Sequence, residues 1–396
     1  MSKCPIWQIG HRFKKSSDSP KDLDSLNRVF IVLTSCVYHL KKLDWILIIV
    51  AILLVGIGLL SIYSSSLGKG DFLNFKKQVI FFGIGFILML LISFFDWRLL
   101  RENPHLILVL YFLCLALLVG LFFFAPEIRG TKSWYKLGPI SLDPIEFTKI
   151  ALIILLAKYF STRHIEMYRI THILISGLYI FIPSLLVLRQ PDLGSVLILI
   201  FLWLGVLILS GIKISHFLIL VLVFLLIFIF SWKTFLKDYQ KERILSFIWP
   251  QISDPLKIGW NQRQAKIAVG SGGIFGQGIG KGSQTQLGFL PEPQTDFIFA
   301  AIAEETGLIG VSILLFLFSI LIWRIFKIAI FSRSNFAYLF ASGLSLLFII
   351  QIFINIGMNI GILPIIGIPL PLVSYGGSSL IAIFLALGIL QSIKTH

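Results

Sequence analysis

The sequence is poor in charge and in cysteine. Only 13% of its 396 residues are charged and 57% are hydrophobic, whereas soluble domains carry about 25% charged residues. This composition excludes a soluble globular enzyme and a disordered chain. The three cysteines, Cys4, Cys36 and Cys114, are too few and too scattered for a disulfide framework or a zinc site.

Acidic residues are scarcer than basic ones. Asp and Glu number 19 against 34 Lys and Arg, which gives a net charge of +15. In a membrane protein such an excess marks loops held at an anionic leaflet or facing a phosphorylated lipid. Nucleic acid is not expected as a partner, because no basic stripe is interleaved with exposed aromatic residues.

Long apolar runs define the fold class. The runs are continuous rather than alternating, so they predict membrane-spanning helices and not the strands of a barrel. We expect an all-α polytopic membrane protein of about ten transmembrane helices. The predicted spans cover residues 45–65, 78–95, 106–125, 147–159, 172–188, 193–210, 217–232, 297–323, 336–363 and 373–393.

Loop charge orients the chain. Residues 1–43 are polar and basic and predict a cytoplasmic tail, ahead of a ten-span membrane domain over residues 44–396. With the tail inside, the inner segments hold 18 Lys and Arg and the short outer loops hold 8. The positive-inside rule therefore places both termini in the cytoplasm. One long loop, residues 233–295, is then extracytoplasmic.

Charged groups near the fourth span are the first functional candidates, since ionisable groups in or beside spans are costly. Glu146 and Lys149 follow a helix start at Asp143-Pro144 and lie three residues apart on one helix face, where they can pair. The spacing is equally consistent with a structural ion pair and with a functional site.

Two outer loops present further polar candidates. Arg129, Lys132 and Trp134 form a cationic and aromatic cluster, which is typical of an interfacial anchor or of a site for a sugar ring and a phosphate. Arg189 and Asp192 flank a tight turn, which they can close by pairing or use to bind a ligand.

The segment 270–282 holds seven glycines but no Walker A pattern. It predicts a tightly folded outer loop or a flexible linker.

The segment FLPEPQTDFIFAAIAEETG, residues 289–307, carries the sharpest signal. Thr295 or Asp296 can cap the eighth span. A straight helix over residues 297–323 would be about 40 Å long, against about 30 Å for the hydrocarbon core, so Asp296 is expected at the outer boundary. Glu304 would lie about 12 Å deeper near the same face. A cap explains Asp296, but Glu304 and Glu305 need partners such as Lys149 or water.

The chain between the last two spans is broken by Pro364, Pro369 and Pro371. Ser374 and Tyr375 follow, where the chain re-enters the membrane, and are candidates for substrate binding. The glycines after them indicate close helix packing.

Four of these motifs, taken in order, resemble the SEDS family (shape, elongation, division, sporulation). They are the RG…W…LG…EF.K stretch, RQPDLGS, TDFIFAAIAEE and GILPIIGIPLPLVSYGGSS. The resemblance covers about residues 44–394, and the wording around the last two motifs is nearest to the elongation-type members. DPIEFTK departs from the family pattern at Ile145, where serine is usual, and the tail 1–43 is longer than the family's.

The resemblance implies a peptidoglycan glycosyltransferase of the bacterial cytoplasmic membrane. It would polymerise lipid II, an undecaprenyl-diphosphate-linked disaccharide-pentapeptide, for cell elongation and rod shape, with a class B penicillin-binding protein as partner. Asp296 would be the catalytic residue. A lipid-carrier flippase and a non-catalytic scaffold for a transpeptidase are the alternatives.

The chemistry of this reaction assigns roles to the candidates. Glycosyl transfer needs a base for the acceptor hydroxyl and cations for the leaving diphosphate. Asp296 is expected as the base, and basic side chains or a divalent cation, Mg²⁺ or Mn²⁺, to take the diphosphate; no organic cofactor is expected. The substrate-binding candidates are Arg129, Lys132, Trp134, Glu146, Lys149, Arg189, Asp192, Glu304, Ser374 and Tyr375.

Overall fold

The computed structural model describes residues 38–126, 133–138, 140–163, 170–234, 241, 245, 247 and 258–396. By its internal contacts the chain divides into two compact units, residues 1–43 with Thr395 and residues 44–394 with His396. The predicted tail, residues 1–43, lies almost wholly outside the described residues. The helices that build the candidate site belong to the second unit.

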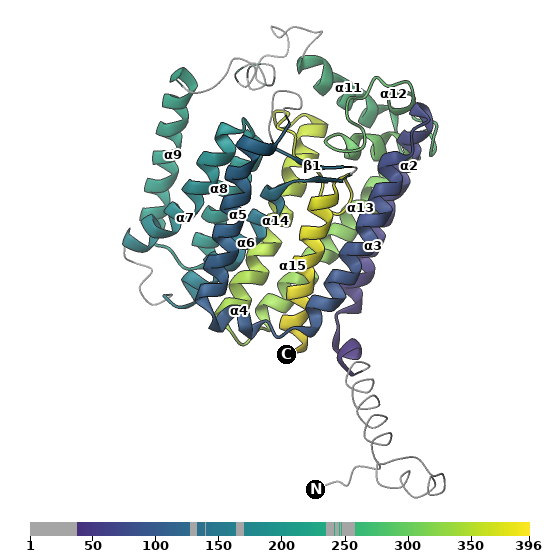
Figure 1. Ribbon diagram of the computed structural model, residues 1–396. Coiled ribbons are helices and arrows are strands. Elements are labelled where there is room, and N and C mark those ends of the chain that lie inside the picture. Colours follow the sequence, from purple (N-terminus) through teal and green to yellow (C-terminus); the bar gives the residue numbers. More distant parts are fainter. Residues whose placement is uncertain are drawn as a thin grey trace, which may run out of the picture. The chain divides into compact units, whose positions relative to one another are not determined.

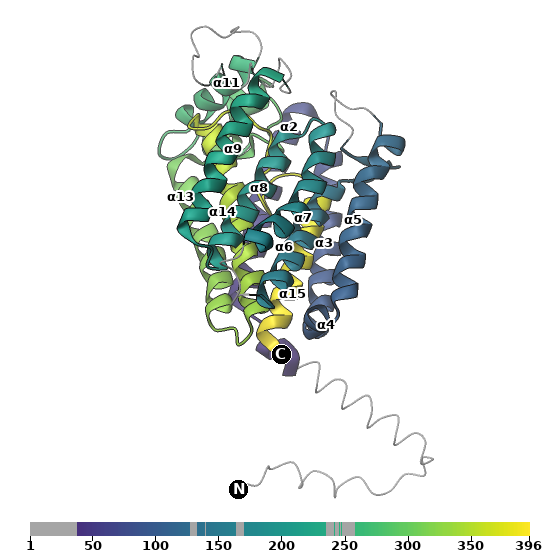
Figure 2. The ribbon, with the colours of Figure 1, turned by 90° about the vertical axis from the view of Figure 1, so that its left-hand side faces the viewer.

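Ten long helices in the described part of the chain form a bundle (Figures 1 and 2). Each overlaps one predicted span, so the polytopic helical fold is confirmed, and seven are long and apolar enough to cross a membrane. They are α2 (Trp45–Lys69), α3 (Leu73–Phe94), α5 (Pro104–Phe124), α6 (Pro144–Ser161), α7 (Ile170–Arg189), α8 (Leu193–Leu209), α9 (Ile214–Thr234), α13 (Ile298–Ile330), α14 (Asn335–Ile360) and α15 (Gly377–Thr395).

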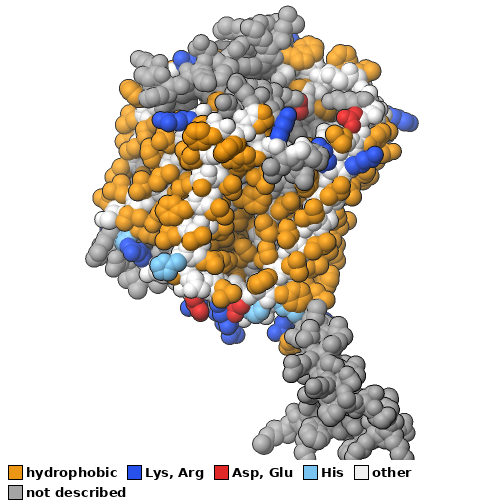
Figure 3. All heavy atoms as spheres, viewed as in Figure 1, with side chains coloured by type: hydrophobic (Ala, Val, Ile, Leu, Met, Phe, Trp, Pro, Cys, Tyr) orange, Lys and Arg blue, Asp and Glu red, His pale blue; other side chains and the backbone are white. Residues whose placement is uncertain are grey.

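The surface of the bundle is layered by polarity. Figure 3 shows hydrophobic side chains over the middle of the bundle, with acidic and basic side chains gathered towards its two ends. Such an apolar middle suits the hydrocarbon core of a membrane, which helices can cross because they satisfy their backbone hydrogen bonds internally. The protein is therefore a multi-pass membrane protein.

Aspartates mark three of the helix starts. The carboxylates of Asp44, Asp143 and Asp192 accept hydrogen bonds from the first-turn N–H groups of Leu47, Ile145 and Ser195. Each bond satisfies a backbone donor that has no partner inside its helix. The sequence therefore fixes where α2, α6 and α8 begin.

Helix α6 lies in the centre of the bundle. Its predicted span, residues 147–159, was short for a crossing, but the helix begins at Pro144 and packs against α5, α14, α7 and α8. Fourteen of its residues are buried. A central helix has no lipid-facing side, so its charged groups can be compensated by other protein groups.

One end of the bundle carries small elements. A two-stranded antiparallel hairpin, β1 (Tyr135–Leu137) and β2 (Ile140–Leu142), lies there together with α11 (Ile258–Ser271) and α12 (Ser283–Gln286) (Figure 1). The hairpin falls in a predicted loop and was not expected. The opposite end carries the short α4 (Arg98–Glu102) and the C-terminus.

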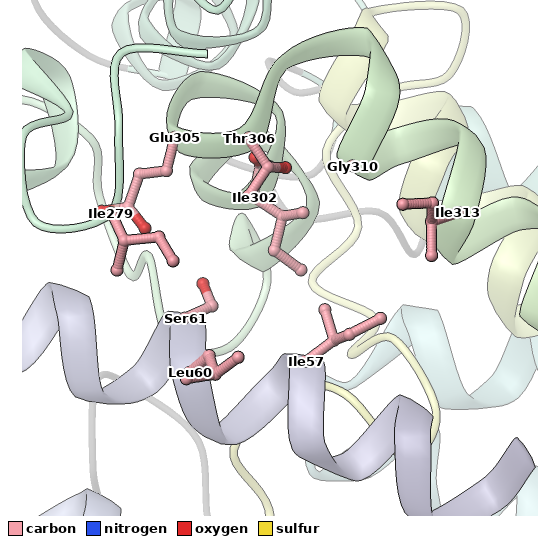
Figure 4. A pocket seen from close by; sticks show the side chains of 9 residues that line it. All are labelled: Ile57, Leu60, Ser61, Ile279, Ile302, Glu305, Thr306, Gly310 and Ile313. Carbon is pink, nitrogen blue, oxygen red and sulfur yellow. The ribbon is translucent and has the colours of Figure 1, made fainter. Parts of the chain in front are cut away.

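The eighth span is not the straight helix that the sequence predicts. Gly307 has φ 63° and ψ −163°, a conformation open essentially only to glycine, and it breaks α13 into a short first part, Ile298–Thr306, and a long second part. Figure 4 shows the bend, beside a cavity of about 190 Å³ between α2 and α13. The expectation of one straight helix over residues 297–323 is therefore wrong, and Glu304 lies before the break, in the short first part.

The glycine-rich segment is a folded loop that packs on this break. The N–H groups of Gln277 and Gly278 donate to the carbonyls of Glu304 and Glu305, at 2.9 and 3.0 Å. A Cβ on Gly276 would lie 2.2 Å from the Glu305 carbonyl oxygen, so only glycine allows this approach. The loop thus satisfies carbonyl groups that the end of the short helix leaves without partners.

Candidate active site

The candidate site lies at the end of the bundle that carries the hairpin. The Ser378 hydroxyl at the start of α15 accepts from the N–H of Asp143 at 2.8 Å and donates to the carbonyl of Ser141 at 3.2 Å. These bonds join β2, α6 and α15 at one place. The proline-rich loop, residues 361–376, runs between α14 and α15 and bonds to the turn that precedes α13.

Asp296 does not cap the helix that follows it. The N-cap residue of α13 is Phe297, and no side chain of that position bonds the first turn. The N–H groups of Thr295 and Phe297 instead donate to the carbonyl of Glu292, which makes a turn ahead of the helix. The predicted capping by Thr295 or Asp296 is therefore wrong, because the helix begins two residues beyond Asp296.

The proline-rich loop packs against this turn. The Ser374 hydroxyl donates to the carbonyl of Thr295 at 2.7 Å, and the N–H of Tyr375 donates to the carbonyl of Gln294 at 2.8 Å. The Ser374 hydroxyl is thus used to hold backbone. Tyr375 is half-buried, and burial raises the pKa of its phenol.

Gly367 brings the same loop to the Asp296 side chain. Gly367 has φ +82°, and a Cβ there would lie 3.3 Å from Oδ2 of Asp296. Both the backbone conformation and the space favour glycine. The Asp296 carboxylate therefore lies directly against the proline-rich loop, just ahead of α13.

Two asparagines of α14 hold the turn from the other side, and sequence reasoning missed them. The side-chain amides of Asn355 and Asn359 each donate to the carbonyl oxygen of Asp296 at 3.0 Å. Both side chains are fully buried. The available signal was a pair of asparagines four residues apart, on one face of a largely apolar helix.

The predicted pairing of Glu146 with Lys149 is confirmed. Lys149 Nζ lies 2.7 Å from Glu146 Oε1, and both side chains are buried. Asp143 caps the same helix just outside it. Desolvation, and then the charges of Glu146 and Asp192, raise the pKa of the Asp143 carboxyl well above its usual range. The start of α6 thus groups acidic side chains with one lysine.

Arg189 and Asp192, both in the described part of the chain, form no ion pair with each other. Asp192 instead caps α8, and Arg189 is exposed. A Cβ on Gly194 would lie 3.2 Å or less from atoms of Ile366. The start of α8 therefore lies against the proline-rich loop, on the same side as Asp143.

Glu304 and Glu305 hold the folded loop rather than Lys149. The Glu304 carboxylate accepts from the N–H of Gln284 at 2.6 Å and from both the N–H and the hydroxyl of Thr285, at 3.0 and 2.7 Å. Glu305 accepts from the Ser64 hydroxyl. The expectation that these acids need Lys149 or water is wrong, because donors of residues 284–285 satisfy Glu304 and a hydroxyl of α2 satisfies Glu305. The Glu304 carboxylate is accordingly engaged within the protein.

The aromatic candidate Trp134 is half-buried at the start of the hairpin, next to Tyr135, whose hydroxyl donates to the carbonyl of Leu117 at 2.6 Å. Arg129 and Lys132 lie outside the described residues. Within the described residues no three His, Cys, Asp or Glu side chains are grouped to hold a metal ion.

This fold and site define a class, namely polytopic helical membrane proteins with a buried acidic site at one end of the bundle. Within that class, the sequence pattern of the FtsW/RodA/SpoVE cell cycle proteins matches residues 44–396. The chain belongs to this family, which confirms the resemblance to SEDS proteins.

Known relatives are similar in sequence to this protein along most of its chain. The peptidoglycan glycosyltransferase MrdB of Escherichia coli K12 is 43% identical over 290 residues, 72% of this chain and 77% of that protein. Stage V sporulation protein E of Bacillus subtilis 168 is 37% identical over 365 residues, 89% of this chain and 97% of that protein.

A solved structure is also similar to this chain. Its description reads "Structural coordination of polymerization and crosslinking by a peptidoglycan synthase complex". One chain of it is 31% identical, with a TM-score of 0.74, and the match covers 89% of this chain and 97% of that one.

Proposed function

We propose that this protein is a peptidoglycan glycosyltransferase that polymerises lipid II into glycan strands. The observation that carries the proposal is the place of Asp296, which precedes the N-cap residue of α13 and lies against the proline-rich loop at the end of the bundle. Relatives named as peptidoglycan glycosyltransferases support the same activity.

In this proposal Asp296 removes the proton from the 4-hydroxyl of the acceptor sugar as that oxygen attacks the donor sugar. Attack opposite the α-linked diphosphate inverts the anomeric centre and gives a β-1,4 linkage. Undecaprenyl diphosphate then leaves without needing a general acid, so one carboxylate suffices. Glu304, which is engaged by the loop at residues 283–285, has no part in this step.

The remaining site residues would bind substrate or hold the turn that bears Asp296. Arg189 is exposed beside the site and is proposed, with Arg129 and Lys132, to attract the diphosphate. Trp134 would stack on a sugar ring. The Glu146–Lys149 pair, with Asp143 and Asp192, would shape the polar wall, while Ser374 and Tyr375 would act by holding the turn that bears Asp296.

A divalent cation, Mg²⁺ or Mn²⁺, is part of the proposal as a charge partner for the diphosphate. The described residues offer no group of three His, Cys, Asp or Glu side chains for such an ion. Titration with EDTA, followed by restoration with each metal, tests this point.

The proposed orientation places both termini in the cytoplasm and the site outside. Asp44 precedes the first helix of the bundle and Lys394 lies in the last turn of its final helix. The side chains of these two residues lie 3.2 Å apart, so the chain enters and leaves the bundle on the same side. Cysteine placed at Ser283 should react with an impermeant reagent in intact cells, and cysteine at Ser16 should not. The reverse pattern would invert the orientation.

The proposed partner is a class B penicillin-binding protein, which would crosslink the strands during cell elongation. A related chain belongs to a complex described as coordinating polymerization and crosslinking, which supports this partner. Motif wording nearest to elongation-type members supports the role in rod shape. Depletion in a rod-shaped host should give round cells, whereas a division role would give filaments.

The direct test supplies purified protein with labelled lipid II, with and without the partner. Glycan chains are expected, and their yield should rise with the partner. Transfer of lipid II across vesicle membranes without chain formation would support a flippase instead. Chains formed only by the partner would support a scaffold.

A further inference from the structure

We propose that Asn355 and Asn359 are positioning residues that fix the backbone of Asp296 and so aim its carboxylate. This inference rests on the proposed function, in which Asp296 is the base. It concerns residues of α14 that need not contact substrate and act through Asp296.

The helix that follows Asp296 is capped by its neighbour. An α-helix leaves its first N–H groups without partners inside the helix, and a side chain at the N-cap position usually accepts from one of them. In α13 that position is Phe297, whose side chain has no acceptor atom. Oδ1 of Asn359 accepts from the N–H of Ala300 at 3.2 Å instead. A residue 59 positions away therefore performs the capping and fixes where α13 begins.

The same two amides saturate the carbonyl oxygen of Asp296. This oxygen has two lone pairs, and it receives one hydrogen bond of 3.0 Å from each asparagine. Rotation of the peptide after Asp296 would break both bonds at once. The peptide plane, and with it the direction in which the side chain leaves the backbone, is thereby fixed.

Asn355 also sets the spacing between Asp296 and the loop that faces its carboxylate. Its second amide donor goes to the carbonyl of Ile368 at 2.7 Å. Ile368 follows Gly367, whose α-carbon lies against the Asp296 carboxylate. The Asn355 side chain thus bonds both the turn that bears Asp296 and the proline-rich loop that faces its carboxylate.

The energetics favour a specific role for these two side chains. An amide buried in an apolar helix costs free energy unless its donors and acceptor are bonded, and both donors of each asparagine are used here. Two apolar residues would fill α14 with less dependence on hydrogen bonding. What asparagines add is the placement of the turn at Asp296.

The test replaces each asparagine by leucine, which keeps the size and removes the hydrogen bonds. Gln351→Leu is the matched control, because it removes a buried amide from the same face of α14 one turn earlier. Asn355→Leu and Asn359→Leu should lower the kcat of lipid II polymerisation by about 10²-fold, since misplacement by about an ångström costs that much. KM should stay close to that of Gln351→Leu, and each variant should still fold and insert, although the unpaired backbone groups lower its melting temperature.

Two further readouts separate positioning from general damage. The acidic limb of the pH profile of kcat should move in the asparagine variants and not in Gln351→Leu, because the surroundings of the base have changed. In an Asp296→Asn background, adding Asn359→Leu should cause little further loss, because residues that act through one group are not additive.

The outcomes distinguish this inference from the proposed function. If Asp296→Asn is inactive but the leucine variants are as active as Gln351→Leu, or lose activity additively with Asp296→Asn, the positioning role is refuted and the base assignment stands. If Asp296→Asn is active, the proposed function itself fails. Asn355→Ser and Asn359→Ser carry the same expectations wherever a leucine variant does not accumulate in the membrane.

Discussion

The two ends of the bundle each hold an aspartate, and they hold it differently. Asp44 is held by its carboxylate, which caps α2 and receives Arg324 at 2.5 Å and Lys394 at 3.2 Å. Asp296 is held by its backbone carbonyl, which receives two asparagine amides. One arrangement uses the charge for structure. The other fixes the residue through its backbone and directs its carboxylate towards the candidate site.

Helix α13 connects the two arrangements. Arg324, near its far end, reaches Asp44, while its first turn follows Asp296. The break at Gly307 separates the short segment at the site from the long second part that packs in the bundle. The comparison predicts that the same chemical change will affect stability at one end and catalysis at the other.

The largest expected change in stability follows Asp44→Asn. Asparagine still caps a helix about as well as aspartate, but it leaves the charge of Arg324 buried without its carboxylate. Breaking a buried pair in this way costs about 3–5 kcal/mol. Thermal unfolding in detergent should show the loss, while lipid II polymerisation per folded molecule stays normal. An unchanged melting temperature would contradict the assigned role of Asp44.

A second prediction concerns the buried pair at the site. Glu146→Lys or Lys149→Glu alone places two like charges together in the bundle, which should cost several kcal/mol. The double exchange restores opposite charges and should give more folded protein than either single variant, measured by fluorescence-detected gel filtration. Restoration will be partial, because lysine in the first turn of α6 opposes the helix dipole. A double variant worse than both singles would contradict the pairing.

Gly367→Ala sharpens the comparison at the Asp296 end. The matched control is Gly288→Ala, since Gly288 has φ +77° and open space around its α-carbon. Both variants carry similar backbone strain, about 1 kcal/mol or somewhat more. Only Gly367→Ala presses on Asp296, so it alone should lower kcat, by about tenfold or more. Equal activity of the two variants would show that the carboxylate tolerates displacement.

The smallest effects are expected in the pH dependence of stability. Desolvation opposes ionisation of Asp44, but the hydrogen bond from Arg324, the N–H of Leu47 and the charge of Lys394 outweigh it, and the pKa lies below its usual 3.8. This carboxylate therefore stabilises the fold above about pH 4 and ceases to do so as the pH falls through the lowered pKa.

The raised pKa of Asp143 gives stability the opposite dependence on pH. Its contribution to stability is complete below the usual aspartate pKa and is lost as the pH rises through the raised value. Melting temperatures across a pH series should show that Asp44→Asn removes the loss on the acid side. Asp143→Asn should remove the loss of stability that accompanies rising pH. If the melting temperatures of the two variants changed with pH in the same way, the opposite effects assigned to Asp44 and Asp143 would be contradicted.

Much of this fold follows from the sequence because membrane helices depend on local composition. Apolar runs located all ten helices, and the Asp143-Pro144 pair located the start of α6. The spacing of Glu146 and Lys149 predicted their ion pair, since residues three apart on a helix must be neighbours.

What the sequence did not predict depends on contacts between distant residues. The cap of α13 comes from Asn359, and the partners of Glu304 come from residues 283–285. No local pattern records such pairings. The break at Gly307 was missed for the same reason, because a single glycine in an apolar run usually continues the helix and here the loop at residues 272–278 stabilises the break.

The most direct test of the account is lipid II polymerisation by Asp296→Asn, compared with Asp44→Asn. Asp296→Asn should insert, melt like the wild type and lose glycan synthesis by about 10²–10⁴-fold, the usual contribution of a positioned base. Asp296→Glu should keep partial activity at best, because an added methylene displaces the carboxylate. Polymerisation near the wild-type rate by well-folded Asp296→Asn would contradict the account and favour the flippase or scaffold.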